Sequence, residues 1–299
     1  MKPSSLLKTI VIVIIYVTSY NSAFSQSSKP FSFVFMTDIH LQPEKHAVEG
    51  FEKAIAEINH LKPDFVITGG DLIMDALKQS YGRADSLYEL YDKVSSELNM
   101  PVHNTMGNHE IFGICNTKTD LSQNPEYNEK MFEKRLGSSY YTFSYNGWKF
   151  FILNSVEKDD MGCYIGWIDD QQKEWIKKEL SKTDKDTPIA ITTHIPFITT
   201  FNQVYYGSSL GNDSSLVVAN SKDILDLFKD HNLKLVMQGH THIAEDVYID
   251  GIHYITGGAI CGAWWNGPNR NTEEGFALFK VDGDKFNWEY VDYGWEVKK

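Results

Sequence analysis

The stretch Phe33-Val34-Phe35-Met36-Thr37-Asp38-Ile39-His40 runs from apolar residues into two polar side chains. Its first part is rich in aromatic and β-branched residues and is typical of a buried strand. Four later stretches have the same form, in which an apolar run ends in a polar group that is often flanked by glycine. These groups are Gly70-Asp71, Gly107-Asn108-His109-Glu110, His194 and Gly239-His240-Thr241-His242.

Segments of helical periodicity separate the apolar runs, which predicts an α/β protein with two mixed sheets flanked by helices. Helices are expected at residues 48–61, 86–98, 169–180 and 221–231. Strands are expected at residues 31–36, 65–67, 101–102, 189–191 and 233–237, with a hairpin within 140–156. From residue 246 onward the pattern predicts antiparallel strands at 247–249, 252–255, 275–281 and 286–291. No repeat or low-complexity tract divides residues 30–299, so one domain is expected over residues 26–299.

In an α/β sheet, ligands gather beyond the carboxyl ends of the strands. The five strand ends therefore bring seven polar side chains to one rim: Asp38, His40, Asp71, Asn108, His194, His240 and His242. The residues of each Asp-x-His or His-x-His pair are two apart, so in an extended chain their side chains share a face. Glycines 69, 70, 107 and 239 are expected to allow unusual turns and a close approach to a bound ion.

The donor set of this rim contains nitrogen and oxygen but no sulfur, which suits iron, manganese or zinc better than copper(I). A catalytic zinc usually takes three protein ligands and a water. Seven ligands are too many for one such ion but suit two ions if one carboxylate bridges them. The remaining histidines are expected to be structural: His46, His60, His103, His231 and His253.

Taken together, the five polar groups resemble the signature of the calcineurin-like metallophosphoesterases over residues 33–242. The resemblance implies a four-layer α/β/β/α sandwich with a binuclear metal centre at the sheet edge. It implies that one ion is held by Asp38, His40 and His242, that the other is held by Asn108, His194 and His240, and that Asp71 bridges them. His109 is similar to the family's catalytic histidine, which is not a ligand.

The resemblance also implies a reaction, the hydrolysis of a small phosphoester by a hydroxide generated on two divalent or trivalent ions. His109 would protonate the leaving group, and Glu110 either orients His109 or caps the local backbone. The compact single domain looks more like the bacterial cyclic-nucleotide phosphodiesterases than like the purple acid phosphatases, which have Tyr where this chain has Met74. A phosphodiester substrate is slightly favoured. The alternatives are a phosphomonoesterase, of the acid phosphatase or nucleotidase type, and a catalytically inactive metal-binding exported protein.

Three segments are expected to overhang the rim: residues 111–139, 197–220 and 261–274. In the third, Trp264 or Trp265 is a candidate to stack on an organic group, and Asn266 or Arg270 to contact phosphate. Tyr205 and Tyr206 in the second segment are candidates of the same kind. The alternative is a packed loop with buried tryptophans.

Residues 1–25 have the pattern of a cleaved signal peptide: Lys2 and Lys8, an apolar run at 10–17, and small residues at Ala23 and Ser25. The run is too short to span a bilayer, so a periplasmic or extracellular protein without a membrane anchor is expected. The formal charge of −12 disfavours extended nucleic acid as a partner and leaves a small phosphorylated molecule. Neither the oligomeric state nor a pairing among Cys115, Cys163 and Cys261 is predicted.

Overall fold

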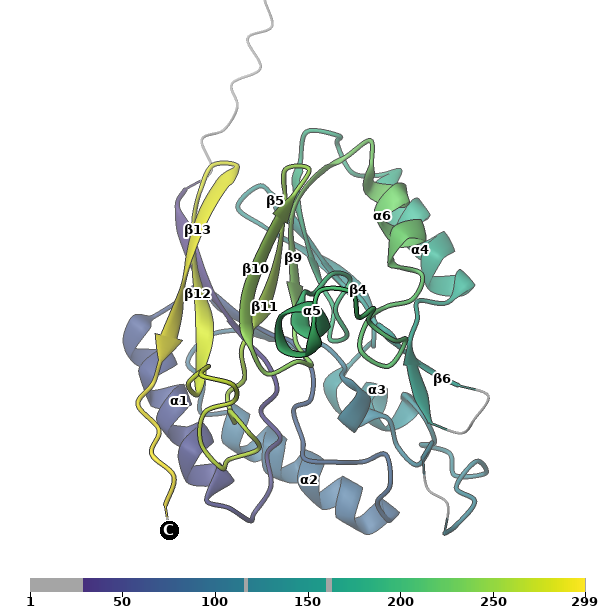
Figure 1. The fold of residues 1–299 in the computed structure, drawn as a ribbon, viewed down its shortest axis with the longest axis vertical. Coiled ribbons are helices and arrows are strands. Elements are labelled where there is room, and N and C mark those ends of the chain that lie inside the picture. The colour runs from purple at the N-terminus through teal and green to yellow at the C-terminus, as the bar shows by residue number, and fades with distance from the viewer. Residues whose placement is uncertain (1–28, 116–117, 160–162, 299) are drawn as a thin grey trace, which may run out of the picture.

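The structure, a computed structural model, describes residues 29–115, 118–159 and 163–298 of the 299-residue chain (Figure 1). The expected signal peptide lies outside the described residues. Within these ranges, no helix combines the length and the apolar character that crossing a membrane requires.

One mixed sheet has five strands in the order β13-β12-β1-β2-β3. These are β1 (Phe31–Met36), β2 (Phe65–Thr68), β3 (Val102–His103), β12 (Gly275–Asp282) and β13 (Lys285–Asp292). Strands β1, β2 and β3 are parallel, whereas β12 pairs antiparallel with both β1 and β13. The expected strands of this sheet are confirmed to within two residues at each end.

The second sheet has six strands in the order β10-β11-β9-β8-β5-β4. These are β4 (Tyr141–Tyr145), β5 (Trp148–Ile152), β8 (Pro188–Thr192), β9 (Asn232–Gln238), β10 (Ala244–Ile249) and β11 (Ile252–Gly257). The expectation of purely antiparallel pairing after residue 246 is wrong for β11, which is antiparallel to β10 but parallel to β9. Because β11 follows β10 through a tight hairpin, local sequence reveals only its antiparallel partner.

The two sheets pack face to face through a layer of aromatic side chains. Phe33 of β1 stacks on Phe65 and Phe279 of its own sheet, with ring centroids 5.1 and 4.7 Å away. The edge of its ring meets Phe150 of β5 in the other sheet at 5.6 Å. The residues on the other face of β1, such as Val34, belong to a separate hydrophobic core on the outer side of the sheet. The strands are therefore buried on both faces, which explains their continuous apolar runs.

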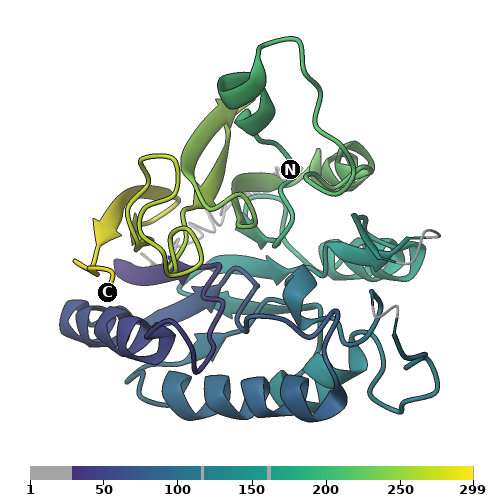
Figure 2. The ribbon, with the colours of Figure 1, turned by 60° about the horizontal axis from the view of Figure 1, so that its bottom comes forward.

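Helices cover the two outer faces and complete the four layers. Helices α1 (Ala47–Leu61) and α2 (Tyr81–Ser95) lie side by side against the five-stranded sheet (Figure 2). Helices α4 (Asp170–Leu180) and α6 (Ser221–Phe228) pack on the six-stranded sheet. The expected α/β fold, with two mixed sheets flanked by helices, is confirmed.

Some elements differ from the sequence prediction. Helix α2 begins five residues earlier than expected, because the side chain of Ser80 accepts a hydrogen bond from the Arg83 N–H and caps it. Helix α3 (Lys130–Leu136), helix α5 (Phe201–Tyr206), strand β6 (Val156–Lys158) and strand β7 (Tyr164–Gly166) were not expected. All four are short and lie in or beside connecting segments, where periodicity gives little signal.

Candidate metal centre

The polar groups after β1, β2, β8 and β9 lie together where the strand ends of both sheets meet. Their backbones are not extended as the sequence analysis assumed, because five of the seven candidate ligands have φ between 45° and 73°. These residues are Asp38, His40, Asp71, His240 and His242. Left-handed backbone is unfavourable for residues with a Cβ and persists only where neighbouring structure enforces it. Here the Asp38 N–H donates to the Gly70 carbonyl at 3.0 Å, and the His40 N–H to the Asp71 carbonyl at 2.9 Å.

Two glycines are required beside these loops for different reasons. Gly70 has φ of 87°, and a Cβ there would lie 2.7 Å from His194 Nδ1. Gly107 does not have a positive φ, but a Cβ there would lie 2.3 Å from Asp71 Oδ1. The expectation of unusual turns is therefore right for Gly70, whereas Gly107 is needed for close packing against a candidate ligand.

The first donor group consists of Asp38, His40 and His242. His242 Nδ1 donates to the Gly262 carbonyl at 2.6 Å, which leaves the Nε2 lone pair directed into the group. That Nε2 lies 3.1 Å from His40 Nε2 and 3.2 Å from Asp38 Oδ1. All three side chains are buried.

The second donor group consists of Asn108, His194 and His240. His194 Nδ1 donates to the Gly69 carbonyl at 2.8 Å, and His240 Nε2 donates to the Ser215 carbonyl at 3.0 Å. The remaining nitrogens therefore direct lone pairs inward, with His240 Nδ1 3.2 Å from His194 Nε2. The Asn108 side-chain oxygen lies 2.9 Å from the same Nε2.

Asp71 lies between the two groups. Its Oδ2 is 3.2 Å from His194 Nε2 and 3.5 Å from His40 Nε2. Its Oδ1 accepts a hydrogen bond from the His109 backbone N–H at 2.9 Å. One carboxylate oxygen is therefore within reach of both donor groups, as a bridging ligand must be.

The chemistry of the combined cluster calls for cations. Backbone carbonyls fix the tautomers of three imidazoles, so that their nitrogen lone pairs face inward. These lone pairs and the carboxylate oxygens are all acceptors, and too few N–H donors lie between them to pair them. Burial favours the neutral form of both His194 and His242 and so lowers their pKa. The Asp71 carboxylate outweighs burial and raises the pKa of His194 to about 9, and Asp38 in the same way raises the pKa of His242. Burial and neighbouring histidines lower the pKa of His40, and lower that of His240 to about 4. Metal ions would take the place of protons here, and the nitrogen and oxygen donors present fit such ions.

His109 lies at the exposed edge of the cluster, with a ring nitrogen within 4.8 Å of donor atoms of His40 and Asp71. Its Nδ1 donates to the Met74 carbonyl at 2.5 Å, so Nε2 is the nitrogen that faces the cluster, 3.8 Å from Asp71 Oδ2. Its side chain is 23% exposed, whereas the candidate ligand His40 beside it is buried. The geometry leaves His109 Nε2 free to exchange a proton with a bound molecule.

Cys261 is buried with its thiol 3.8 Å from His242 Nδ1, the nitrogen already bonded to Gly262. Burial raises the pKa of this thiol. The sulfur faces the outer nitrogen of His242, but it also lies within 4.8 Å of a ring nitrogen of His40, so a thiol lies beside the first donor group.

Glu110 caps backbone and does not orient His109. Its buried carboxylate accepts four backbone N–H bonds, from Gly107 at 2.7 Å and from Asp71, Leu72 and Ile73 at 2.8 to 3.1 Å. Burial and the Asp71 carboxylate raise the pKa of Glu110 to about 8, and these N–H donors oppose that rise. Glu110 therefore joins the loop that carries His109 to the loop that carries Asp71.

The two tryptophans of the third overhanging segment have different positions. Trp264 is 41% exposed, and its ring lies 4.4 Å from the His242 ring, so it forms part of the wall of the site. Trp265 is only 1% exposed, and its indole N–H donates to the His40 carbonyl at 3.1 Å. The prediction that Trp265 stacks on a ligand is wrong, because its ring packs in the core. Asn266 is exposed, and its side chain bonds Lys45 and backbone carbonyls of its own loop.

Arg270, Tyr205 and Tyr206 lie together. The Arg270 guanidinium lies 4.4 Å from the Tyr205 ring centroid and donates to the Tyr206 hydroxyl at 2.6 Å. Next to it, the Asn269 side chain donates to the His242 carbonyl at 3.2 Å. The second and third overhanging segments are thus joined near the cluster.

Tyr164 of β7 was not predicted as a site residue, but its ring packs edge-to-face with the His240 ring, with centroids 6.2 Å apart. Burial and the Asp71 charge raise the pKa of Tyr164 to about 12. The residue before it, Cys163, forms a disulfide with Cys115. No motif marks Tyr164, and its proximity to the cluster appears only in the folded chain.

Glu110→Gln is expected to destabilise the protein by about 2 kcal/mol, because an amide NH2 would face backbone N–H donors that then lose their acceptor. Urea unfolding measures the change, and Glu52→Gln on the exposed face of α1 is the matched control. Equal unfolding midpoints for the two variants would contradict the capping role.

Comparisons with known proteins agree with this fold. Residues 31–244 match the calcineurin-like phosphoesterase family. A dimetal phosphatase from Danio rerio superposes with a TM-score of 0.63 at 14% identity, covering 88% of this chain and 96% of that one. GAP50, described as the anchor in the inner membrane complex of Plasmodium, superposes with a TM-score of 0.52 at 15% identity, covering 90% of this chain and 86% of that one. No curated protein matches the sequence significantly. With the family match extending over most of its length, this chain belongs to the calcineurin-like phosphoesterases.

Proposed function

We propose that this protein is an exported, binuclear metal-dependent phosphoesterase that hydrolyses a small phosphoester, with phosphodiesters favoured. The observation that carries the proposal is the buried cluster of inward-facing lone pairs and carboxylates beside a partly exposed histidine. A phosphoester anion resists attack because of its own negative charge, and a site that concentrates cations removes that resistance.

The residues of the two donor groups would each hold one ion of iron, manganese or zinc. Asp38, His40 and His242 form one group, Asn108, His194 and His240 the other, and Asp71 is shared. When bound, such ions neutralise phosphoryl charge and lower the pKa of water. The carbonyls of Gly69, Ser215 and Gly262 hold three of the imidazoles in the required tautomer.

His109 would supply the proton that the leaving group requires. Because its Nδ1–H donates to the Met74 carbonyl, the transferred proton is the one that Nε2 carries in the imidazolium form of His109, which becomes neutral imidazole after the transfer. That transfer converts an alkoxide leaving group into an alcohol, a role worth about 10²- to 10⁴-fold in rate for a well-placed side chain.

The wall of the site suits a small organic phosphate. The exposed ring of Trp264 beside His242 could stack on an organic group of the substrate. Arg270 provides a cation for a phosphate where the second and third overhanging segments join. The net charge of −12 disfavours extended nucleic acid. The diester preference rests on the compact form of the chain.

Metal binding is tested by thermal unfolding of chelator-treated protein. Adding Mn²⁺ or Zn²⁺ is expected to raise Tm by several degrees, because the ions bind the folded cluster and relieve its internal repulsion. Asp71→Asn is expected to lose most of this rise, since both groups lose their shared charge. A wild-type Tm that does not respond to any of these metals would contradict a metal centre.

Catalysis is tested with bis-p-nitrophenyl phosphate and p-nitrophenyl phosphate in the presence of added metal. The diester is expected to be hydrolysed with the higher kcat/KM, and His109→Ala is expected to lower kcat at least 100-fold with near-normal metal content. A monoester preference would identify a phosphomonoesterase instead. Absence of turnover with either ester and every metal would favour a non-catalytic binding protein, a role of the same kind as the anchor described for GAP50.

Export is supported by the Cys115–Cys163 disulfide, since disulfides persist mainly in oxidising compartments. Expression of the full chain in a bacterium that exports proteins is expected to yield a mature form beginning at Gln26, released with the periplasm. Intact mass identifies it. A cytoplasmic product that retains residues 1–25 would overturn this part of the proposal.

A further inference from the structure

Tyr164 is the one tyrosine whose ring is found against a candidate metal ligand in the part of the chain that the structure describes. Its ring meets His240 edge-on, at an interplanar angle of 85°. The side chain is half-buried. Among the described residues its hydroxyl has no hydrogen-bond partner, whereas Tyr88 and Tyr293 donate to backbone carbonyls.

Tyr164 is the first residue of β7, which pairs antiparallel with β6 in a short hairpin. Lys158 of β6 is its partner across the two strands. The hairpin is held by contacts on both sides. On one side the Gly166 N–H donates to the Ser214 carbonyl, next to the Ser215 carbonyl that accepts from His240. A Cβ at Gly166 would lie 2.4 Å from the Val217 carbonyl, so β7 is closely packed there.

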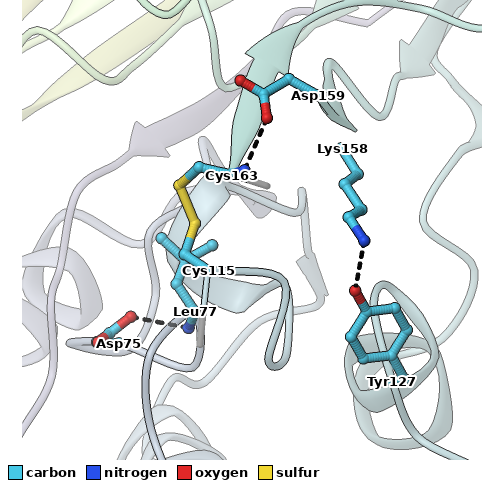
Figure 3. Close-up of a disulfide and its surroundings, with 7 residues drawn as sticks. All are labelled: Asp75, Leu77, Cys115, Tyr127, Lys158, Asp159 and Cys163. Carbon is cyan, nitrogen blue, oxygen red and sulfur yellow. Dashed lines mark hydrogen bonds between the residues drawn. A yellow bond between two sulfur atoms is a disulfide. The ribbon is translucent and has the colours of Figure 1, made fainter. Parts of the chain in front are cut away.

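On the other side the disulfide joins Cys163 to Cys115 (Figure 3). The Cys163 N–H also donates to Asp159 Oδ1 at 2.7 Å, which closes the hairpin around the bridge. Lys158 donates to the Tyr127 hydroxyl at 3.0 Å. The bridge thus fixes the residue that immediately precedes Tyr164.

The partner cysteine belongs to the loop that carries His109. The Cys115 N–H donates to the Leu77 carbonyl, and the Ala76 N–H donates to the His109 carbonyl at 2.7 Å. The disulfide therefore connects the backbone around the candidate proton donor to the hairpin of Tyr164.

We propose that Tyr164 is a substrate-binding residue, whose hydroxyl donates a hydrogen bond to a phosphoryl oxygen of the ester, and that the Cys115–Cys163 disulfide holds it in place. A phenol is neutral and a donor at pH 7, and a phosphoryl oxygen beside His240 would be an acceptor of negative charge. The packing of the ring against His240, with centroids 6.2 Å apart, and the absence of another partner among the described residues leave the hydroxyl available for this role. The proposal rests on the phosphoesterase function proposed above.

The experiment measures binding of inorganic phosphate to the metal-loaded, full-length protein by calorimetry, together with diester hydrolysis. Tyr164→Phe removes only the hydroxyl and is expected to raise the Kd for phosphate about tenfold and to lower kcat/KM by a similar factor, with unchanged metal content. Tyr140→Phe is the matched control, because Tyr140 is also half-buried but its hydroxyl accepts from Gln171 away from the cluster. It is expected to bind phosphate as the wild type does.

The role of the disulfide is tested by the C115S/C163S pair of substitutions in two backgrounds. In the wild-type background it is expected to weaken phosphate binding several-fold, and in the Tyr164→Phe background it is expected to add little, because the same contact is already lost. Additive effects would show that the bridge acts independently of Tyr164 and would overturn that part of the proposal.

The outcomes separate this inference from the proposed function. If the wild type hydrolyses an ester and binds phosphate while Tyr164→Phe equals it in both, the role of Tyr164 is wrong and the phosphoesterase function stands. If the wild type does neither with any metal, both proposals fail. Because Tyr164→Phe removes a half-buried hydroxyl without a partner among the described residues, folding is expected to be unaffected, and circular dichroism verifies this.

Discussion

The position of the Asp71 carboxylate, shared between two groups of inward-facing donors, is the constraint on which the rest of the site depends. Its Oδ2 lies 3.2 Å from His194 Nε2 and 3.5 Å from His40 Nε2, so a shift of either sheet would remove it from one group. Its loop is held by the Glu110 carboxylate through three N–H bonds and packs against Gly107. Much of the local structure serves to hold one buried oxygen between two histidines.

That placement requires a rigid frame, because the two histidines come from different sheets. His40 follows β1 and His194 follows β8, and the two sheets pack against each other through the largely aromatic core between them. The edge of Phe33 against Phe150 is one of the contacts that fix their separation. The same rigidity maintains the left-handed backbone at Asp38 and Asp71, where the loops hydrogen-bond each other. Packing far from the site therefore determines its geometry.

The predictions from sequence differed in success for physical reasons. All seven candidate ligands lie together, since each follows a strand and strand ends meet at one edge. The reasoning about their orientation was wrong, because alternation in an extended chain does not apply to left-handed residues such as His240 and His242. Trp264 and Trp265 are neighbours of one type, yet one faces the site and the other packs in the core. Nothing local distinguishes them, because burial depends on what the rest of the chain places against each ring.

The sequence by itself determined the fold class, the family resemblance and the donor types, because these follow from periodicity, residue chemistry and order along the chain. Only the tertiary structure decided which nitrogen of His194, His240 and His242 faces inward, that Glu110 caps the Asp71 loop, that Cys115 pairs with Cys163, and that Tyr164 lies beside His240. Each of these depends on a contact between segments distant in sequence, such as the His194 imidazole with the Gly69 carbonyl. Such contacts leave no periodic trace in the chain, because either partner alone is compatible with many surroundings.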